Sequence, residues 1–235
     1  MFNKEQISKY LYLDIETVPS YRSLSDLKKE NDRLYKLWKR RESYYRMNYE
    51  DCKNESDDLI YLSKAGLEAE FSRIVCVSFG SFTDEMEKKF ISFFGNDEID
   101  ILQKSHKILN NASLKNWRLC GHNIKNFDVP FLGKRMVYNG INPPNNIKVW
   151  DKKPWEIQFT DTSEILSFGS WSQQKYLSLD LLSHSLNINS SKEKMDGSKV
   201  GHHFWELEDY QGIKEYCELD VKSVMDIMNK MCFDN

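Results

Sequence analysis

The sequence predicts an α/β protein in which helices flank a central mixed β-sheet. Three early segments are rich in β-branched and aromatic residues, and helical and extended patterns alternate after them. That order of elements favours layers of helices packed against one sheet. At 235 residues, 40% hydrophobic and 29% charged, the chain can form one sizeable core and has the composition of a soluble globular protein.

The first strand is predicted at residues 10–16, a mostly apolar run. We expect Val18-Pro19-Ser20 to end it, because proline cannot continue a central ladder. Strand alternation places Asp14 and Glu16 on the same side of this strand. Hard oxygen ligands of this kind suit magnesium and manganese. The pair is therefore a candidate metal site, and the alternative is a surface acid pair at a strand end.

The second and third strands are predicted at residues 73–79 and 89–94, with Gly80-Ser81 forming the turn between them. Residues 22–70 separate the first two strands by far more than a hairpin needs. We expect a helical insertion there, with a basic and aromatic half before an acidic run. Its residues form either a track for a single nucleic-acid strand or an amphipathic helix with a solvated charged face. The residues concerned are Arg33, Lys36, Lys39, Arg40 and Arg41 with Tyr35, Trp38, Tyr44 and Tyr45.

A helix capped by Asp97 and a short strand at residues 118–120 are expected next. Gly121 then allows close backbone approach, and Asn123 can hold the following loop through side-chain hydrogen bonds. Asp128 is a further candidate metal ligand, and it can equally cap the helix predicted at residues 129–138.

A strand at residues 157–160 and helices at 178–186 and 213–231 complete the predicted fold. Tyr216 and Asp220 are four residues apart and share a face of the last helix. A phenol in that place can hydrogen-bond a water held by a metal on Asp220. The alternative is an ordinary, partly buried helix pair. Asp161 and Asp180 lie near element ends and are expected to be caps.

Taken together, these motifs resemble those of the DEDD superfamily of 3′-5′ exonucleases in its tyrosine subclass, which implies a ribonuclease H-like fold. The motifs are Asp14-Ile15-Glu16-Thr17, Asn123-x-x-x-Phe127-Asp128 and Tyr216-x-x-x-Asp220. The flanking residues resemble predicted exonucleases related to the proofreading domain of family-B DNA polymerases. Those flanks are residues 13–19, 72–80, 121–123 and 195–198.

The resemblance implies a mechanism with two divalent ions, Mg²⁺ or Mn²⁺. By similarity, Asp14, Glu16 and Asp220 hold one metal, and Asp14 with Asp128 supports the other. Tyr216 is then expected to orient the attacking water and to help remove its proton. In the substrate site, Thr17 is expected to contact the 3′ nucleotide through its backbone, and Asn123 is expected to bind substrate as well. The side chain of Phe127 either stacks on the terminal base or belongs to the core.

The function implied is hydrolysis of single-stranded DNA from its 3′ end, which releases nucleoside 5′-monophosphates. Two alternatives stay open: the same chemistry on RNA, and a non-catalytic nucleic-acid-binding module on an inherited fold. The net charge of −3 favours local contact with a strand end over coating of long nucleic acid. Whether such an enzyme proofreads, repairs or degrades DNA is not readable from the residues.

We expect residues 1–235 to form a single exonuclease domain in the cytoplasm. No apolar run approaches the roughly 20 residues of a membrane helix, and no signal peptide is recognisable. The five cysteines are scattered without a CxxC pair, which indicates reduced thiols and no disulfide framework.

Overall fold

A mixed β-sheet forms the centre of the molecule in the computed structural model, which describes residues 2–168, 177–189 and 195–233. The described strands form one five-stranded sheet in the order β3-β2-β1-β4-β5. β1 pairs antiparallel with β2 and parallel with β4, so the predicted mixed sheet is confirmed. The strands are β1 (Tyr10–Pro19), β2 (Ser72–Phe82), β3 (Lys88–Phe94), β4 (Arg118–Gly121) and β5 (Phe159–Asp161).

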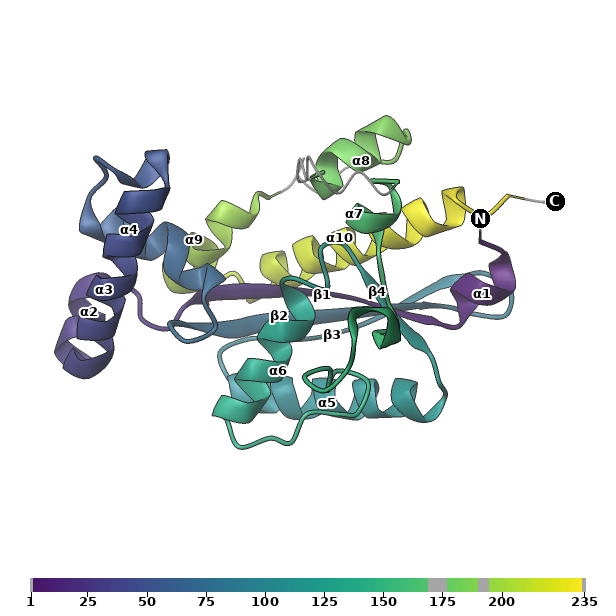
Figure 1. The fold of residues 1–235 in the computed structure, drawn as a ribbon, viewed down its shortest axis with the longest axis horizontal. Helices are drawn as coiled ribbons and strands as arrows, with labels where there is room; N and C mark the ends of the chain where they lie inside the picture. Colours follow the sequence, from purple (N-terminus) through teal and green to yellow (C-terminus); the bar gives the residue numbers. More distant parts are fainter. Residues whose placement is uncertain (1, 169–176, 190–194, 234–235) are drawn as a thin grey trace.

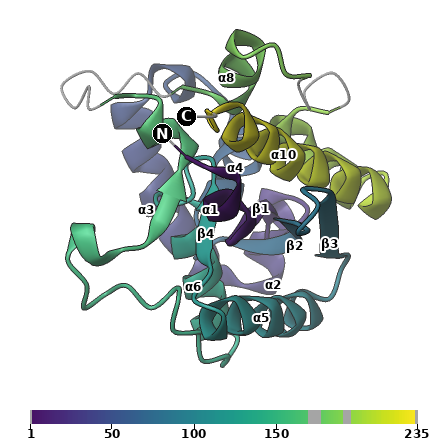
Figure 2. The same cartoon turned by 90° about the vertical axis from the view of Figure 1, so that its right-hand side faces the viewer.

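Helices cover both faces of this sheet (Figures 1 and 2). α10 packs on β1, β2 and β3 from one side, and α5 and α6 pack on the other side. The α-helices are α1 (Lys4–Ser8), α2 (Leu24–Glu30), α3 (Asp32–Asn48), α4 (Asp57–Lys64), α5 (Glu98–Leu114), α6 (Asp128–Tyr138), α7 (Thr162–Ile165), α8 (Leu179–Ser185), α9 (Val200–Trp205) and α10 (Tyr210–Lys230). Short 3₁₀ helices are η1 (Glu50–Cys52), η2 (Ala65–Leu67), η3 (Pro154–Glu156) and η5 (Gly197–Lys199). Among the described residues, no helix combines the length and hydrophobicity of a membrane span.

β1 is longer than its sequence predicts, because it continues through Pro19. β4 pairs with β1 only along residues 10–12, whereas β2 stays paired with β1 as far as the Pro19–Ser72 contact. The last part of β1 is therefore an edge with a partner on one side, where a residue without an N–H is tolerated. Because β1 and β4 separate after residue 12, the second half of β1 has no strand partner on the β4 side.

The predicted turn at Gly80-Ser81 is wrong, because β2 runs on to Phe82. The turn lies instead at residues 83–87, closed by the Thr83 N–H donating to the Glu87 carbonyl at 2.8 Å. Gly80 has a packing role. A Cβ at this position would lie 2.6 Å from Met225 Sδ and 2.7 Å from Val221 Cγ1. The missing side chain lets α10 approach the sheet closely.

Residues between β1 and β2 form the predicted helical insertion, which stands at one end of the sheet (Figure 1). The Ser20 N–H donates to the Phe71 carbonyl at 2.9 Å, so the two ends of the insertion meet across the β1–β2 pair. The insertion also has its own apolar cluster, which includes Trp38 and Tyr61 and excludes the residues of the main core. It is a small unit attached at the tip of a hairpin.

The basic and aromatic half of the insertion is an amphipathic helix, α3, and only its outer face is solvated. Trp38 is fully buried in the insertion core, and Tyr45 is buried beside it. Lys39 and Arg46 both form ion pairs with the buried Glu42 and with Asp57. These residues are therefore part of the structure of the insertion. Of the two alternatives, the structure shows the amphipathic helix, and the buried Trp38 and Tyr45 cannot belong to a strand-binding track.

The close approach at Gly80 yields a stability prediction. Gly80→Ala is expected to lower the free energy of unfolding by about 2 kcal/mol, because the new methyl group overpacks against Val221 and Met225. Urea denaturation followed by circular dichroism measures the change. Gly133→Ala on α6 is the matched control, since a Cβ there meets nothing within 4 Å and the helix gains up to about 1 kcal/mol. Equal stability of the two variants would contradict this packing role.

Candidate active site

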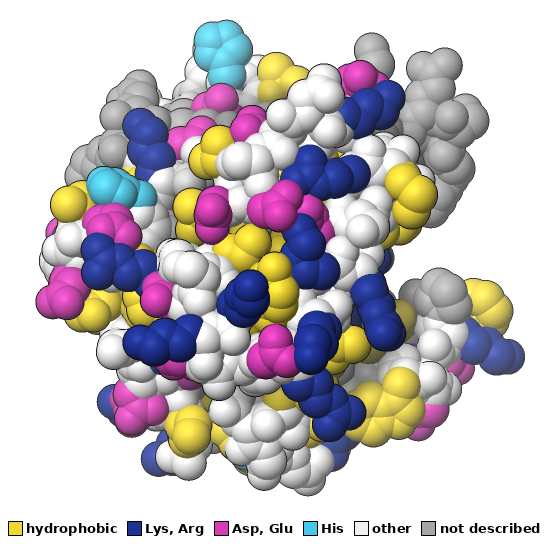
Figure 3. Space-filling view, turned by 90° about the vertical axis from the view of Figure 1, so that its left-hand side faces the viewer, with side chains coloured by type: hydrophobic (Ala, Val, Ile, Leu, Met, Phe, Trp, Pro, Cys, Tyr) yellow, Lys and Arg dark blue, Asp and Glu magenta, His cyan; other side chains and the backbone are white. Residues whose placement is uncertain are grey.

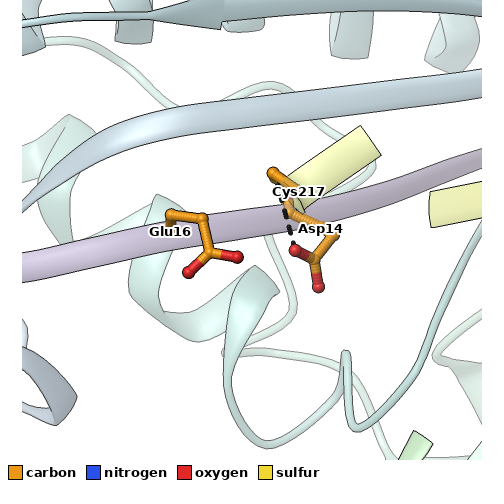
Figure 4. Close-up of side chains that lie close together, drawn as sticks. All are labelled: Asp14, Glu16 and Cys217. Atoms are coloured by element: carbon orange, nitrogen blue, oxygen red, sulfur yellow. Dashed lines mark hydrogen bonds between the residues drawn. The ribbon is translucent and has the colours of Figure 1, made fainter. Parts of the chain in front are cut away.

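β1 presents two carboxylates on one face. Leu13 and Ile15 point into the main core, while Asp14 and Glu16 alternate with them and line a cleft on the other face. Figure 4 shows both carboxylates on the same side of the strand, with Cys217 of α10 beside them. One ligand atom from each of these three residues lies within 4.8 Å of the others. The predicted convergence of Asp14 and Glu16 therefore holds in the structure.

Asp128 is tied directly to this strand. The backbone N–H of Ile15 donates to Asp128 Oδ1 at 3.1 Å, and this bond joins residues 113 positions apart. Asp128 is the first residue of α6, and the N-cap position is occupied by Phe127 without a side-chain capping bond. The capping alternative for Asp128 is thus not what the structure shows. Its buried carboxylate faces β1 and the cleft.

The loop between β4 and α6 is held by buried Asp161. Its carboxylate accepts hydrogen bonds from the N–H of Asn123 at 2.9 Å and of Lys125 at 3.3 Å, and it also caps α7. Asn123 adopts a positive φ of 58°, which asparagine tolerates better than most residues. A Cβ at Gly121 would lie 2.9 Å from the Leu13 carbonyl oxygen, so glycine is required where this loop leaves the sheet.

α10 supplies the third set of side chains. Tyr216 and Asp220 are both buried, and both line the cleft, as their spacing predicts. Cys217, next to Tyr216, lies 3.3 Å from Asp14 Oδ2 and donates its thiol hydrogen there. Gly197 of η5 also lines the cleft beside Tyr216, and a Cβ on it would lie 3.7 Å from Tyr216 Oη.

All five predicted catalytic residues thus face one open cleft of about 370 Å³. Two of the three predicted substrate-binding residues, Asn123 and Phe127, also line it. Phe127 is partly buried against the main core and lies 5.2 Å from Phe131 between ring centroids, which confirms its core alternative. Because it also lines the cleft, its stacking on a terminal base stays a prediction. Thr17 is not among the lining residues. Its hydroxyl donates to the Gly66 carbonyl at 2.7 Å, and its backbone contact with substrate stays a prediction.

Burial raises the pKa of Asp14 and of Glu16 well above the usual range, and neighbouring carboxylates raise it further. Burial likewise raises the pKa of Asp128 to about 7, against the lowering effect of backbone donors such as Ile15. The pKa of Tyr216 is also raised, first by burial and then by Asp220, Glu16 and Asp14, so its hydroxyl stays protonated. Several buried oxygen donors that repel one another are a donor set that fits a divalent cation.

Comparison with known proteins places this arrangement in a family. A family model described as "Predicted 3'-5' exonuclease related to the exonuclease domain of PolB" matches residues 65–228. The chain belongs to this family. The resemblance seen in its motifs is thereby confirmed for most of its length. None of the curated proteins matches the sequence.

The fold of this predicted exonuclease is similar to that of solved structures. One match is a family B DNA polymerase from the hyperthermophilic archaeon Pyrobaculum calidifontis, with a TM-score of 0.54 and 14% identity. The match covers 94% of this chain and 24% of the polymerase chain, so the chain spans about a quarter of that protein. At this identity the likeness concerns the fold alone, and it confirms the expected ribonuclease H-like architecture.

Sequence reasoning missed several residues of the cleft. Helix spacing weakly indicates Cys217 as a residue of the cleft, because it lies three residues before Asp220 and one after Tyr216 on the same helix. Asp180 lines the cleft although only a capping role was expected, and Asp161 caps α7 as expected but also fixes the Asn123 loop. Leu67, at the end of the insertion, lines the cleft with 56% of its surface exposed, and nothing in the sequence indicates it.

The raised carboxyl pKa values yield a prediction on pH and metal. A carboxyl whose folded pKa is raised binds its proton more tightly in the folded state, so metal-free protein should lose stability as pH rises from 3.8 towards about 7. Thermal unfolding in EDTA should show a falling Tm across this window. Mg²⁺ or Mn²⁺ should restore stability most strongly above pH 7, where the carboxylates are ionised.

Asp128→Asn tests which group is responsible. Because the amide cannot ionise, the variant should lose part of the pH dependence and gain a Tm on the order of 5 °C at pH 8 without metal. Asp100→Asn, an exposed acid on α5, is the control and should follow the wild type. A Tm that is flat from pH 5 to 8 in metal-free wild type would refute the repulsion described for this site.

Proposed function

We propose that the chain is a metal-dependent 3′-5′ exonuclease that hydrolyses phosphodiester bonds at the 3′ end of single-stranded DNA and releases nucleoside 5′-monophosphates. One observation carries the proposal. Asp14 and Glu16 from β1, Asp128 from α6, and Tyr216 and Asp220 from α10 converge on a single cleft. Family membership supports the reaction type, and the match to a family B polymerase supports the fold.

The carboxylates of the cleft are the residues that would hold the metals. Asp14, Glu16 and Asp220 would hold one cation, and Asp14 and Asp128 would support the second. Two divalent cations in such a site supply Lewis acidity at the attacking and leaving oxygens. The backbone bond from Ile15 to Asp128 keeps the relevant carboxylate against β1, so the donor set is organised before substrate binds.

Tyr216 has a positioning task in this proposal. Its hydroxyl lines the cleft, where it orients the attacking water by hydrogen bonding. Phe127, at the start of α6, presents a ring to the cleft on which the terminal base stacks. The Asn123 loop, fixed by Asp161, forms the adjoining wall. These roles place the strand end between α6 and α10.

A gel time course tests the reaction. A 5′-labelled single strand, as DNA and as RNA, is incubated with Mg²⁺, Mn²⁺ or EDTA. The expected result is a metal-dependent ladder that shortens from the 3′ end and is faster on DNA. Asp14→Ala and Asp220→Ala should each reduce the rate by about a thousandfold or more, because each removes a metal ligand.

Tyr216→Phe should leave measurable activity, reduced by about a hundredfold, because the metals still activate water. Asp226→Ala is the matched control on the same helix, since Asp226 pairs with Lys88 away from the cleft. A faster ladder on RNA would favour the exoribonuclease alternative. Strand binding without any ladder would favour a binding module, and full activity of Asp128→Ala would contradict the site as built.

A further inference from the structure

α3 of the insertion carries an exposed stripe of cations and apolar side chains that the proposed site does not use. Arg33, Leu37, Arg40 and Tyr44 recur at the spacing i, i+4, i+7 and i+11, which places them on one face of the helix. All four are exposed, with Leu37 at 45% and Tyr44 at 42%. We call these four residues the α3 stripe. The opposite face of α3, with Trp38 and Tyr45, fills the insertion core.

The cations of the α3 stripe are available, whereas the acids beside it are already paired. Asp32 forms an ion pair with Lys36, and Glu68 forms one with Arg41. Among the described residues, no ion pair involves Arg33 or Arg40. Figure 3 shows the face that the insertion presents, where Lys and Arg side chains lie among Asp and Glu side chains. Arg33 and Arg40 can therefore each pair with an anion outside the insertion.

The α3 stripe is connected to the active-site cleft through η2. Arg41 Nε and Tyr45 Oη both donate to Glu68 Oε1, at 2.7 and 2.5 Å. The residue before Glu68 is Leu67, which lines the cleft. The Arg41 guanidinium also lies over the Tyr44 ring, with 4.7 Å from Cζ to the ring centroid. Arg41 thus links Tyr44 of the α3 stripe to Glu68, which directly follows the cleft residue Leu67.

We propose that the α3 stripe binds the part of a single nucleic-acid strand that lies upstream of the 3′ end in the cleft. Tyr44 offers a stacking surface for a base. Arg40 and Arg33, about 10 Å apart along the helix, contact phosphates about three nucleotides apart. The stripe spans about 16 Å from Arg33 to Tyr44 at 1.5 Å per residue. That length accommodates about four or five nucleotides at the 3.4 Å spacing of a stacked strand. The identity of the strand rests on the function proposed above.

Binding in EDTA tests the α3 stripe without requiring cleavage. Fluorescence anisotropy with a labelled single strand of about 20 nucleotides gives the affinity as a function of salt. Arg33→Glu with Arg40→Glu should weaken binding by at least tenfold. Two lost phosphate contacts should also make the slope of log K against log salt shallower by about 1.4. Tyr44→Ala should weaken binding by about tenfold through lost stacking, and Tyr44→Phe should restore it.

The control replaces two exposed cations on the far side of the sheet, Lys104→Glu with Lys107→Glu on α5. Cleavage adds a second readout. The ratio of rates on the long strand and on a trinucleotide should fall about tenfold in the α3 variant, because only the long strand reaches the stripe. If no variant or wild type cleaves any strand, the proposed function fails, while the binding data still decide the role of the stripe.

Three results would overturn the proposal. An unchanged salt slope in the double variant would show that Arg33 and Arg40 contact no phosphate. An equal loss of rate on long and short strands would indicate a structural effect. Competition by poly-glutamate at the same charge concentration as the oligonucleotide would assign the stripe to an acidic protein segment.

Discussion

The structure depends on the early separation of β1 from its parallel neighbour β4. The two strands pair only as far as Tyr12, so the backbone of β1 beyond this point lacks a strand partner on one side. A buried N–H without an acceptor is costly, and the carboxylate of Asp128 removes that cost at Ile15. This hydrogen bond takes the place of strand pairing at Ile15. It also fixes the start of α6 against β1, so that Asp128 lies next to the acids of β1.

The carboxylate cluster is supported by apolar packing around it. Burial and mutual repulsion disfavour ionised carboxylates at this position, and most protein cores have apolar side chains in such places. Here α10 is pressed onto the sheet at Gly80, and the loop after β4 is pressed against Leu13 at Gly121. These two close contacts hold α10 and the loop in place although the acids repel each other. The cleft thus has its geometry before any cation binds.

Local patterns in the sequence predicted the mixed sheet, the helical insertion and the side chains that converge on the cleft. The pairs Asp14 with Glu16 and Tyr216 with Asp220 could be predicted, because strand and helix periods fix which residues share a face. Features that depend on residues distant in the sequence could not be predicted. Gly80 was read as a turn because its neighbour is α10, about 140 positions away. Leu67 gives no local signal. For Trp38 the sequence left a strand track and an amphipathic helix open, because its burial depends on the fold of the insertion.

The attachment of the insertion has a consequence for how the molecule can be divided. Since Ser20 and Phe71 are hydrogen-bonded across an antiparallel pair, a tight two-residue turn can replace residues 21–70 without changing the register of β1 and β2. Closing the two-residue loop costs about 3 kcal/mol less conformational free energy than closing the fifty-residue insertion. The apolar core of the insertion offsets this difference. The helices α2, α3 and α4 are therefore a module in the engineering sense, which can be exchanged at one hairpin tip to alter what surrounds the cleft. The end of the insertion belongs to the scaffold, because Ala69 lies in the main core and the Gly66 carbonyl accepts from Thr17 of β1.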